Sequence, residues 1–297
     1  NKSGLSDLKG VSNDFNNIAK IAYELRKDVI TMLEEAGSGH TASALGTAEI
    51  FASLYFNVLN ISPKNFYDFD RDHLIVSGGH ICPIWYATLC RLGFFSRSEL
   101  WKLRRYGALL QGHPNFEDRN NKKAGLTNIP GVENASGSLG QGLSIAIGKA
   151  IAMKLEGLNN RIYCITGDGE LDEGQIWEAA MFAGNYPVNN LTWIIDKNGI
   201  QLDGETQKIM SLESLRDKLE SFNWYTIEIN GHNVEEIINS CDMAKTITQR
   251  PTAIIAHTIP GKGVDFMEYK FEWHGKPPSA TEKVEALKML NQAEENI

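Results

Sequence analysis

The chain has 297 residues, enough for one large or two ordinary domains, and its 42% hydrophobic and 22% charged residues are ordinary for a globular protein. The formal net charge of −8 argues against a general affinity for nucleic acid or for anionic lipid. No apolar run approaches the roughly 18 residues that a membrane span needs, and no signal peptide is recognisable. The cysteines form no Cys-X-X-Cys pair, which favours buried thiols in a cytoplasmic protein; they are Cys82, Cys90, Cys164 and Cys241.

Helical and strand-like patterns alternate along the chain. Residues 13–35 place apolar side chains at helical spacing and end at Gly37, and a second helix is expected at 46–59. The later apolar runs are mostly continuous, as in strands that are covered on both faces. The runs are 72–77, 161–166, 191–196, 225–229 and 252–257, and the helical patterns among them are 138–156, 173–185, 211–221 and 233–249.

This alternation predicts an α/β fold, a mostly parallel sheet with helices on both faces. Residues 276–278 resemble a linker, and 280–296 predict a terminal helix. We therefore expect a main domain over 1–276 and a C-terminal helical tail over 277–297. Ligands of open parallel sheets bind outside the carboxyl ends of the strands, so the turns after each strand are the places to search.

An acidic turn follows the predicted strand 161–166, in the sequence ITGDGELDEG at 165–174. Asp168 lies between Gly167 and Gly169, which permit unusual backbone angles and the close approach of another group. The spacing does not fit a nicotinamide-binding loop or an EF-hand loop. A tight turn whose acids face water remains an alternative for this segment alone.

The next strand exit strengthens the case for a ligand site. Asn198 lies 30 positions after Asp168, one helix and one strand further on, so the two strand ends should be adjacent in a parallel sheet. A carboxylate, an amide oxygen and a backbone carbonyl suit Mg²⁺ or Ca²⁺, with phosphate oxygens and water completing the coordination. This pair of motifs resembles the signature of thiamine diphosphate sites, where a divalent metal ties the diphosphate to the protein.

A second glycine-rich turn, ASGSLGQG at 135–142, opens the predicted helix 138–156. Its small residues would let the backbone approach a ligand, and Gly148 and Ala152 would let the helix pack closely on its neighbour. Helix–helix packing alone is an equally good explanation of this segment.

Taken together, the motifs closely resemble the transketolase family over nearly the whole chain, and above all its N-terminal, diphosphate-binding half. The resemblance implies the thiamine diphosphate-binding fold, with this chain as the diphosphate-binding (PP) domain. The matching segments are 38–40 with Ser43, 77–80, 111–114, 136–142, 167–174, 196–198 and 273–278.

Histidines matter in such an enzyme because each step of ketol transfer moves a proton to or from a sugar oxygen, and imidazole can donate and accept near neutral pH. The resemblance implies that four of them face the sugar as catalytic residues: His40, His80, His113 and His274. The other three, His73, His232 and His257, are expected to be structural.

The resemblance also assigns the ligands of the cofactor. The implied metal ligands are Asp168, Asn198 and the carbonyl of Ile200. The implied thiamine diphosphate contacts are Ser43, His80, Gly137, Leu139, Gly167, Asp168, Gly169, Glu173, Asn198 and His274. Glu173 and Glu178 match acids that join a proton-sharing network between two active sites, with a solvent-facing helix pair as the alternative.

Some positions depart from the family pattern. Thr41 and Ala42 replace proline and glycine after the first histidine, and Pro260 stands where animal enzymes have a lysine, a role that Lys262 could take over. The basic stretch 102–105 could meet a sugar phosphate, but a solvated helix face is the favoured interpretation.

A complete transketolase also has a pyrimidine-binding domain, for which nothing after 273–278 provides a match. We therefore expect a naturally split enzyme whose partner is a separate C-terminal subunit, in an α2β2 assembly that acts on sugar phosphates, as in the pentose phosphate pathway. An N-terminal fragment of a longer chain is the alternative origin. The alternative functions are the cofactor-binding half of a deoxyxylulose-phosphate synthase or 2-oxo acid dehydrogenase, and a non-catalytic paralogue.

Overall fold

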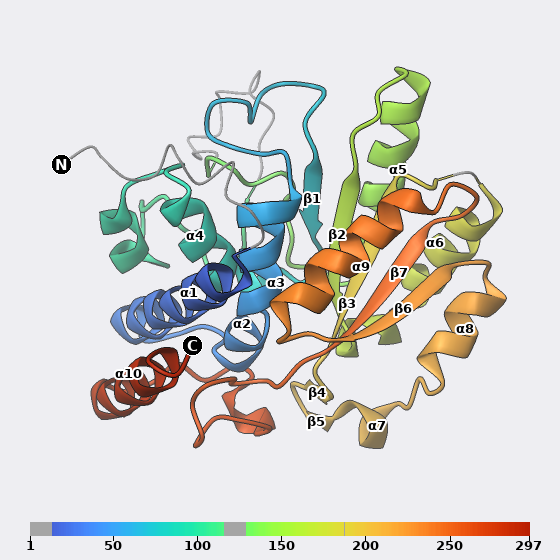
Figure 1. The fold of residues 1–297 in the computed structure, drawn as a ribbon. Helices are drawn as coiled ribbons and strands as arrows, with labels where there is room; N and C mark the ends of the chain where they lie inside the picture. Colours follow the sequence, from blue (N-terminus) through green and yellow to red (C-terminus); the bar gives the residue numbers. More distant parts are fainter. Residues whose placement is uncertain (1–13, 116–128, 187) are drawn as a thin grey trace.

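The computed structural model describes residues 14–115, 129–186 and 188–297 and contains a five-stranded sheet (Figure 1). All four strand pairings in this sheet are parallel, in the order β1-β2-β3-β7-β6. The predicted parallel sheet is confirmed, and each predicted strand run overlaps one observed strand. The strands are β1 (His73–Val76), β2 (Ile162–Gly167), β3 (Leu191–Lys197), β6 (Tyr225–Asn230) and β7 (Thr252–His257).

Helices cover both faces of this sheet, in two separate hydrophobic cores (Figure 1). The first core is formed by α1 (Phe15–Ala36), α2 (Ala42–Gly46), α3 (Ala48–Ser53), α4 (Cys82–Arg91), α9 (Val234–Thr246) and α10 (Ala280–Glu294). The second is formed by α5 (Gly142–Leu155), α6 (Gly174–Asn185) and α8 (Leu215–Ser221).

Successive residues of each central strand enter opposite cores, because side chains alternate across a pleated sheet. In β3, Trp193 belongs to the core of α5, α6 and α8, whereas Ile194 belongs to the core of α1 and α9. In β7, Ile255 likewise belongs to the core of α5, α6 and α8, and Ile254 to the core of α1 and α9. Both faces are buried, which is why the strands are continuous apolar runs rather than alternating ones.

Side chains protect the outer edge of β1. The Glu133 carboxylate accepts a hydrogen bond from Leu74 N at 3.0 Å, and the Asn134 amide accepts one from Val76 N at 3.2 Å. Asn134 Nδ2 also donates to the Val76 carbonyl at 3.0 Å. These three edge groups are therefore paired within the chain, which leaves less of the edge open to another strand.

The C-terminal helix α10 lies beside α1, as Figure 1 shows. Its Ala286 and Leu290 are fully buried in the main core. Lys27 of α1 forms an ion pair with Glu294 at 2.6 Å. The expected terminal helix is thus present, and it is packed against the domain that precedes it.

The structure differs from the sequence-based expectation in several elements. The expected helix 46–59 is divided at Thr47, whose hydroxyl donates to the Ser43 carbonyl, and it ends in a π-helical turn at Leu54–Val58. Helix α4 was missed because residues 82–90 are all buried and therefore lack an amphipathic period. The small hairpin of β4 (Ile200–Gln201) and β5 (Gly204–Glu205) and the short helix α7 (Thr206–Ile209) were also missed.

The burial of the cysteines agrees with expectation, since all four are buried and free. Within the part of the chain that the structure describes, no helix combines the length and the hydrophobicity that a bilayer crossing requires.

Close helix packing occurs at a different glycine from the one expected. Gly148 and Ala152 are exposed on α5, and a Cβ at Gly148 would meet nothing within 4 Å. The expectation that they mediate close packing within the chain is therefore wrong. Gly184 of α6 has this role instead, because a Cβ there would lie 1.6 Å from the Phe222 carbonyl oxygen.

We predict that Gly184→Ala lowers the free energy of unfolding of the chain by about 3 kcal/mol or more, because α6 and the end of α8 must separate to admit the methyl group. Urea denaturation followed by circular dichroism measures this change.

Gly148→Ala is the matched control in α5. It should raise the free energy of unfolding by roughly 0.5–1 kcal/mol, because alanine is the better helix former and the site is open. Equal effects of the two substitutions would contradict the assignment of the close contact to Gly184.

Candidate functional site

A cavity of about 260 Å³ opens at the carboxyl edge of the sheet, where the turns after β1, β2 and β3 converge. The structure brings nearly all the predicted site residues to this one cavity. Those that line it are His40, Ser43, His80, His113, Gly137, Leu139, Gly167, Asp168, Gly169, Asn198, Ile200 and His274.

The pairing of β2 with β3 places the acidic turn beside the asparagine turn. Gly167 is the register partner of Asp196, and Asp168 N donates to the Asp196 carbonyl at 3.1 Å. The Asp168 carboxylate accepts from Gly199 N at 2.8 Å, so the first turn holds the second directly. The predicted adjacency of the two strand ends is confirmed.

Asp196 orients the amide of Asn198, a role that sequence reasoning missed. Asn198 Nδ2 donates to Asp196 Oδ2 at 2.8 Å, and Asn198 Oδ1 accepts from Ile200 N at 3.0 Å. The Thr258 hydroxyl donates to the other carboxylate oxygen of Asp196. The amide therefore cannot rotate freely, and its oxygen stays in the 198–200 turn.

The acidic end of the cavity is lined by carboxylates with no cationic side chain from the described residues beside them. Asp168, Glu170 and Asp196 line it, and among the described residues no lysine or arginine does. Burial, followed by the charge of Asp196, raises the pKa of Asp168 to about 7. Burial also raises the pKa of Glu170 and of Asp196. A bound cation would reverse these shifts, because it favours the charged carboxylates.

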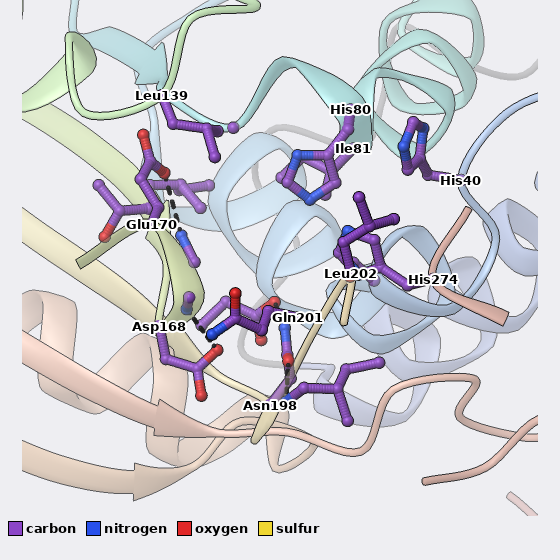
Figure 2. Close-up of a pocket in the computed structure, with 18 of the residues that line it drawn as sticks. His40, His80, Ile81, Leu139, Asp168, Glu170, Asn198, Gln201, Leu202 and His274 are labelled. Carbon is purple, nitrogen blue, oxygen red and sulfur yellow. Dashed lines mark hydrogen bonds between the residues drawn. The ribbon is translucent and has the colours of Figure 1, made fainter. Parts of the chain in front are cut away.

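Four imidazoles gather at the other end of the cavity. The ring centroid of His40 lies 5.3 Å from that of His80, 6.3 Å from that of His113 and 5.6 Å from that of His274. Figure 2 shows His40, His80 and His274 together, across the cavity from Asp168 and Asn198. The four rings come from turns far apart in the sequence, so only the fold assembles this cluster.

The surroundings keep these histidines neutral. Burial, then His274, Arg104 and His113, lowers the pKa of His40 to about 4. Burial and the neighbouring rings lower the pKa of His80 to about 3. Burial also lowers the pKa of His113 and of His274. Neutral imidazole has both a donor and an acceptor nitrogen, as proton transfer in either direction requires.

Two polar atoms of the cavity have no partner in the described structure. Ser43 Oγ and His274 Nδ1 are buried without a hydrogen bond. Buried polar groups are nearly always paired, so these two atoms indicate a ligand that supplies the missing partners. The cavity thus offers a carboxylate–amide end, unpaired polar atoms and a histidine end.

Several cavity residues had no sequence motif to reveal them. Gln201 and Leu202 enter from the β4–β5 hairpin, which lies directly after the 198–200 turn (Figure 2). Glu170 was part of the acidic turn, but no role was assigned to it. Its burial, 3% exposed, could not be recognised from a turn rich in acids.

Glu173 does not line the cavity, contrary to the expected cofactor contact. Glu173 and Glu178 are both exposed at the start of α6.

The remaining histidines pair with carboxylates elsewhere, in keeping with structural roles: His73 with Glu133, His232 with Glu49 and His257 with Glu228.

The positions that depart from the family pattern have local partners. The Thr41 hydroxyl donates to the Lys276 carbonyl at 2.6 Å, and the Ala42 carbonyl accepts from Gly261 N at 2.8 Å. The first bond joins the turns of His40 and His274, and the second joins the turn of His40 to that of Pro260. Lys262 does not line the cavity and lies 3.6 Å from Glu268.

The basic residues of the stretch 102–105 have different surroundings. Lys102 and Arg105 are exposed and pair with Glu99 and Glu35, as a solvated face would. Arg104 instead lies against Gly112, where a Cβ would meet its Nε at 2.3 Å. In addition to burial, its positive charge lowers the pKa of His40 and of His113 at the histidine end of the cavity.

We predict that His40 and His80 of the isolated chain stay neutral down to about pH 5, as measured by NMR titration of ¹⁵N-histidine. Their folded pKa values lie below the ordinary 6.5, so their contribution to stability is complete above pH 6.5 and decreases as the pH falls toward 4.

His80→Asn provides the control, because it removes one imidazole whose pKa is lowered in the folded chain. Its urea midpoint should fall less between pH 7.5 and 5 than that of the unmodified chain. Titration midpoints near 6.5 for both rings would contradict the prediction.

Comparison with known proteins identifies the family. Residues 18–294 match the family described as transketolase, thiamine diphosphate binding domain. The chain is 35% identical over 272 residues to one subunit of the apulose-4-phosphate transketolase of Phocaeicola vulgatus, covering 92% of this chain and 93% of that protein. It is 40% identical over 253 residues to the 6-deoxy-6-sulfo-D-fructose transketolase subunit SqwG of Clostridium sp., covering 85% and 88%.

Solved structures give the same result. The transketolase of Campylobacter jejuni is similar with a TM-score of 0.80 and 30% identity, over 94% of this chain and 48% of that one. A transketolase of Pichia stipitis has a TM-score of 0.84 and 26% identity, over 94% and 41%. The chain spans less than half the length of these two structures. It belongs to the transketolase family, in which it matches the thiamine diphosphate binding domain.

Proposed function

We propose that this chain is the cofactor-binding subunit of a two-subunit transketolase. Together with a C-terminal, pyrimidine-binding subunit it moves a two-carbon ketol unit from a ketose phosphate to an aldose phosphate. The observation that carries the proposal is a single cavity that joins a carboxylate–amide end to four neutral histidines. Relatives of matching length are themselves named as subunits of transketolases.

The acidic end of the cavity fits a divalent cation and a diphosphate. No three His, Cys, Asp or Glu side chains gather as a metal site among the described residues. The expected ligands are of a different kind: the Asp168 carboxylate, the Asn198 amide oxygen and the Ile200 carbonyl, which are hard oxygens that suit Mg²⁺ or Ca²⁺. Charged acids here would repel a diphosphate, and a cation between the acids and the diphosphate would offset that repulsion.

Thiamine diphosphate, when bound, supplies the carbon centre that accepts the ketol unit. Ser43 Oγ and His274 Nδ1 would give hydrogen bonds to it, since neither has a partner among the described residues. Gly137, Gly167 and Gly169 let backbone approach it closely. We also propose that residues 1–276 form this PP domain and that 277–297 are its helical tail.

The four histidines would bind the sugar and move its protons. A neutral imidazole can accept a proton from one sugar hydroxyl and donate one to the next oxygen, and four within one cavity can serve several hydroxyls. Two relatives are named for apulose 4-phosphate and for 6-deoxy-6-sulfofructose, sugars that both carry an anionic group. This supports phosphorylated sugars, including those of the pentose phosphate pathway, as the substrate class.

The assembly and location of the enzyme belong to the same proposal. The exposed carboxylates of Glu173 and Glu178 would meet a partner subunit and link two active sites in an α2β2 assembly. Four buried, free cysteines support a reducing cytoplasm. The alternative functions find no support among the relatives compared, which are transketolases.

The first test measures ketol transfer from xylulose 5-phosphate to ribose 5-phosphate. We expect activity only when this chain is mixed with its pyrimidine-binding partner, thiamine diphosphate and Mg²⁺, because this chain supplies only one side of the site. Transfer by the purified chain alone would contradict the two-subunit assignment. Turnover of a 2-oxo acid in place of the ketose would contradict the transketolase assignment.

A second test concerns the metal ligands. Asp168→Asn should weaken the Mg²⁺-dependent binding of thiamine diphosphate about tenfold or more, because the site loses the charge that holds the cation. Isothermal titration calorimetry measures the dissociation constant.

Asp242→Asn, on the exposed face of α9, is the matched control and should leave the dissociation constant within twofold. An unchanged affinity in Asp168→Asn would reject the metal assignment.

A further inference from the structure

Glu170 is a buried carboxylate to which the proposed function gives no role. It lines the cavity, is 3% exposed and pairs with no lysine or arginine in the described chain. Three donors from three different turns surround it instead. Glu170 Oε1 accepts from the Ser77 hydroxyl and from Gly140 N at 2.7 Å, and Oε2 accepts from Gly167 N at 3.3 Å. We call Glu170, Ser77, Gly140 and Gly167 the Glu170 cluster.

The charge of this carboxylate is stabilised by the start of α5. Gly140 N lies just before the helix, and Gly142 N, its first residue, donates to Ser77 Oγ at 3.0 Å. The Ser77 hydroxyl in turn donates to Glu170, so a chain of hydrogen bonds runs from the helix N-terminus to the carboxylate. A helix N-terminus and backbone N–H donors favour a negative charge.

Each turn of the Glu170 cluster carries residues assigned to the cofactor or the sugar. The turn of Ser77 continues to His80, the turn of Gly140 contains Leu139, and the turn of Gly167 contains Asp168. Ser77 and Gly140 lie 93 and 30 positions from Glu170 in the sequence. One side chain thus links the metal end of the cavity to the histidine end.

The turns have little freedom to move independently. A Cβ at Gly142 would lie 2.4 Å from Ser77 Cβ, and a Cβ at Gly79 would lie 2.8 Å from the Ser136 carbonyl oxygen. Because these backbones are in close contact, a displacement of one turn must shift the next. The three hydrogen bonds to Glu170 join turns that are already closely packed, so the loss of these bonds would be felt by all three turns.

We propose that Glu170 is a positioning residue that holds these three turns in the geometry that binds thiamine diphosphate. It acts through the backbone and transfers no proton, because both its oxygens face donors of the chain. The proposal rests on the function proposed above. Its test measures cofactor affinity separately from ketol transfer, so the two proposals can fail independently.

The test compares Glu170→Ala and Glu170→Gln in the complex with the partner subunit. Calorimetry with thiamine diphosphate and Mg²⁺ gives the dissociation constant, and kinetics give KM for the cofactor and kcat at saturating cofactor. We expect a dissociation constant at least tenfold higher for Glu170→Ala and about threefold higher for Glu170→Gln, whose amide oxygen can still accept from Ser77 and Gly140. The kcat at saturation should stay within about threefold.

Glu133→Gln is the matched control. Glu133 is equally buried, at 4% exposed, and also accepts a backbone hydrogen bond, but it lies at the amino end of β1, where Arg71 and His73 contact it. We expect a lower Tm for this variant with a dissociation constant within twofold of the unmodified protein. Should Glu170→Ala fail to fold, Ser77→Ala removes one donor and should raise the dissociation constant about threefold.

Two results would overturn the proposal. If Glu170→Ala lowers Tm but leaves the dissociation constant within twofold, as expected for Glu133→Gln, the role is merely structural. If Glu170→Gln lowers kcat a hundredfold at unchanged cofactor affinity, the carboxyl takes part in proton transfer. If the unmodified complex binds thiamine diphosphate but transfers no ketol unit, the proposed function fails while the effect of Glu170 on affinity is still measured.

Discussion

The parallel pairing of β2 with β3 is the constraint on which the site depends. It sets Gly167 opposite Asp196, and the Asp168 carboxylate then accepts from Gly199 N. Two oxygen-bearing side chains that are distant in the sequence meet because parallel strands end at the same edge. The remaining turns are arranged around this pair, with Leu139 and Glu170 on one side and the histidines on the other (Figure 2).

The cavity has an uneven distribution of charge, and this follows from burial. At one end no lysine or arginine of the described segments lines the cavity beside the acids, and the pKa of Asp168 rises; at the other end the pKa values of His40 and His80 fall, which keeps these imidazoles neutral. Both shifts have desolvation as their first cause. A cation with a diphosphate would restore the charge of the acids, while the neutral histidines stay ready to exchange protons with a sugar.

Buried carboxylates join the elements of this fold in several places. Glu49 accepts hydrogen bonds from both terminal nitrogens of Arg26 and also pairs with His232. These contacts connect α1, α3 and the turn after β6. Glu133 connects the edge strand to Arg71 and Lys149. Glu170 differs because its donors among the described residues are a hydroxyl and backbone N–H groups, and because it lies in the cavity. The first two stabilise the scaffold, whereas the third shapes the site.

The sequence by itself determined the five strands of the sheet and most of the predicted polar residues of the cavity, since apolar runs, glycine turns and their spacing are local features. It failed where local pattern is uninformative: residues 82–90 of α4 are buried on all sides, Gly148 faces outward while Gly184 makes the close contact, and Glu173 is exposed while Glu170 is buried. Tertiary structure alone decided these cases. Whether a side chain is buried, and which distant donors it meets, depends on how the whole chain packs and not on its neighbours in the sequence.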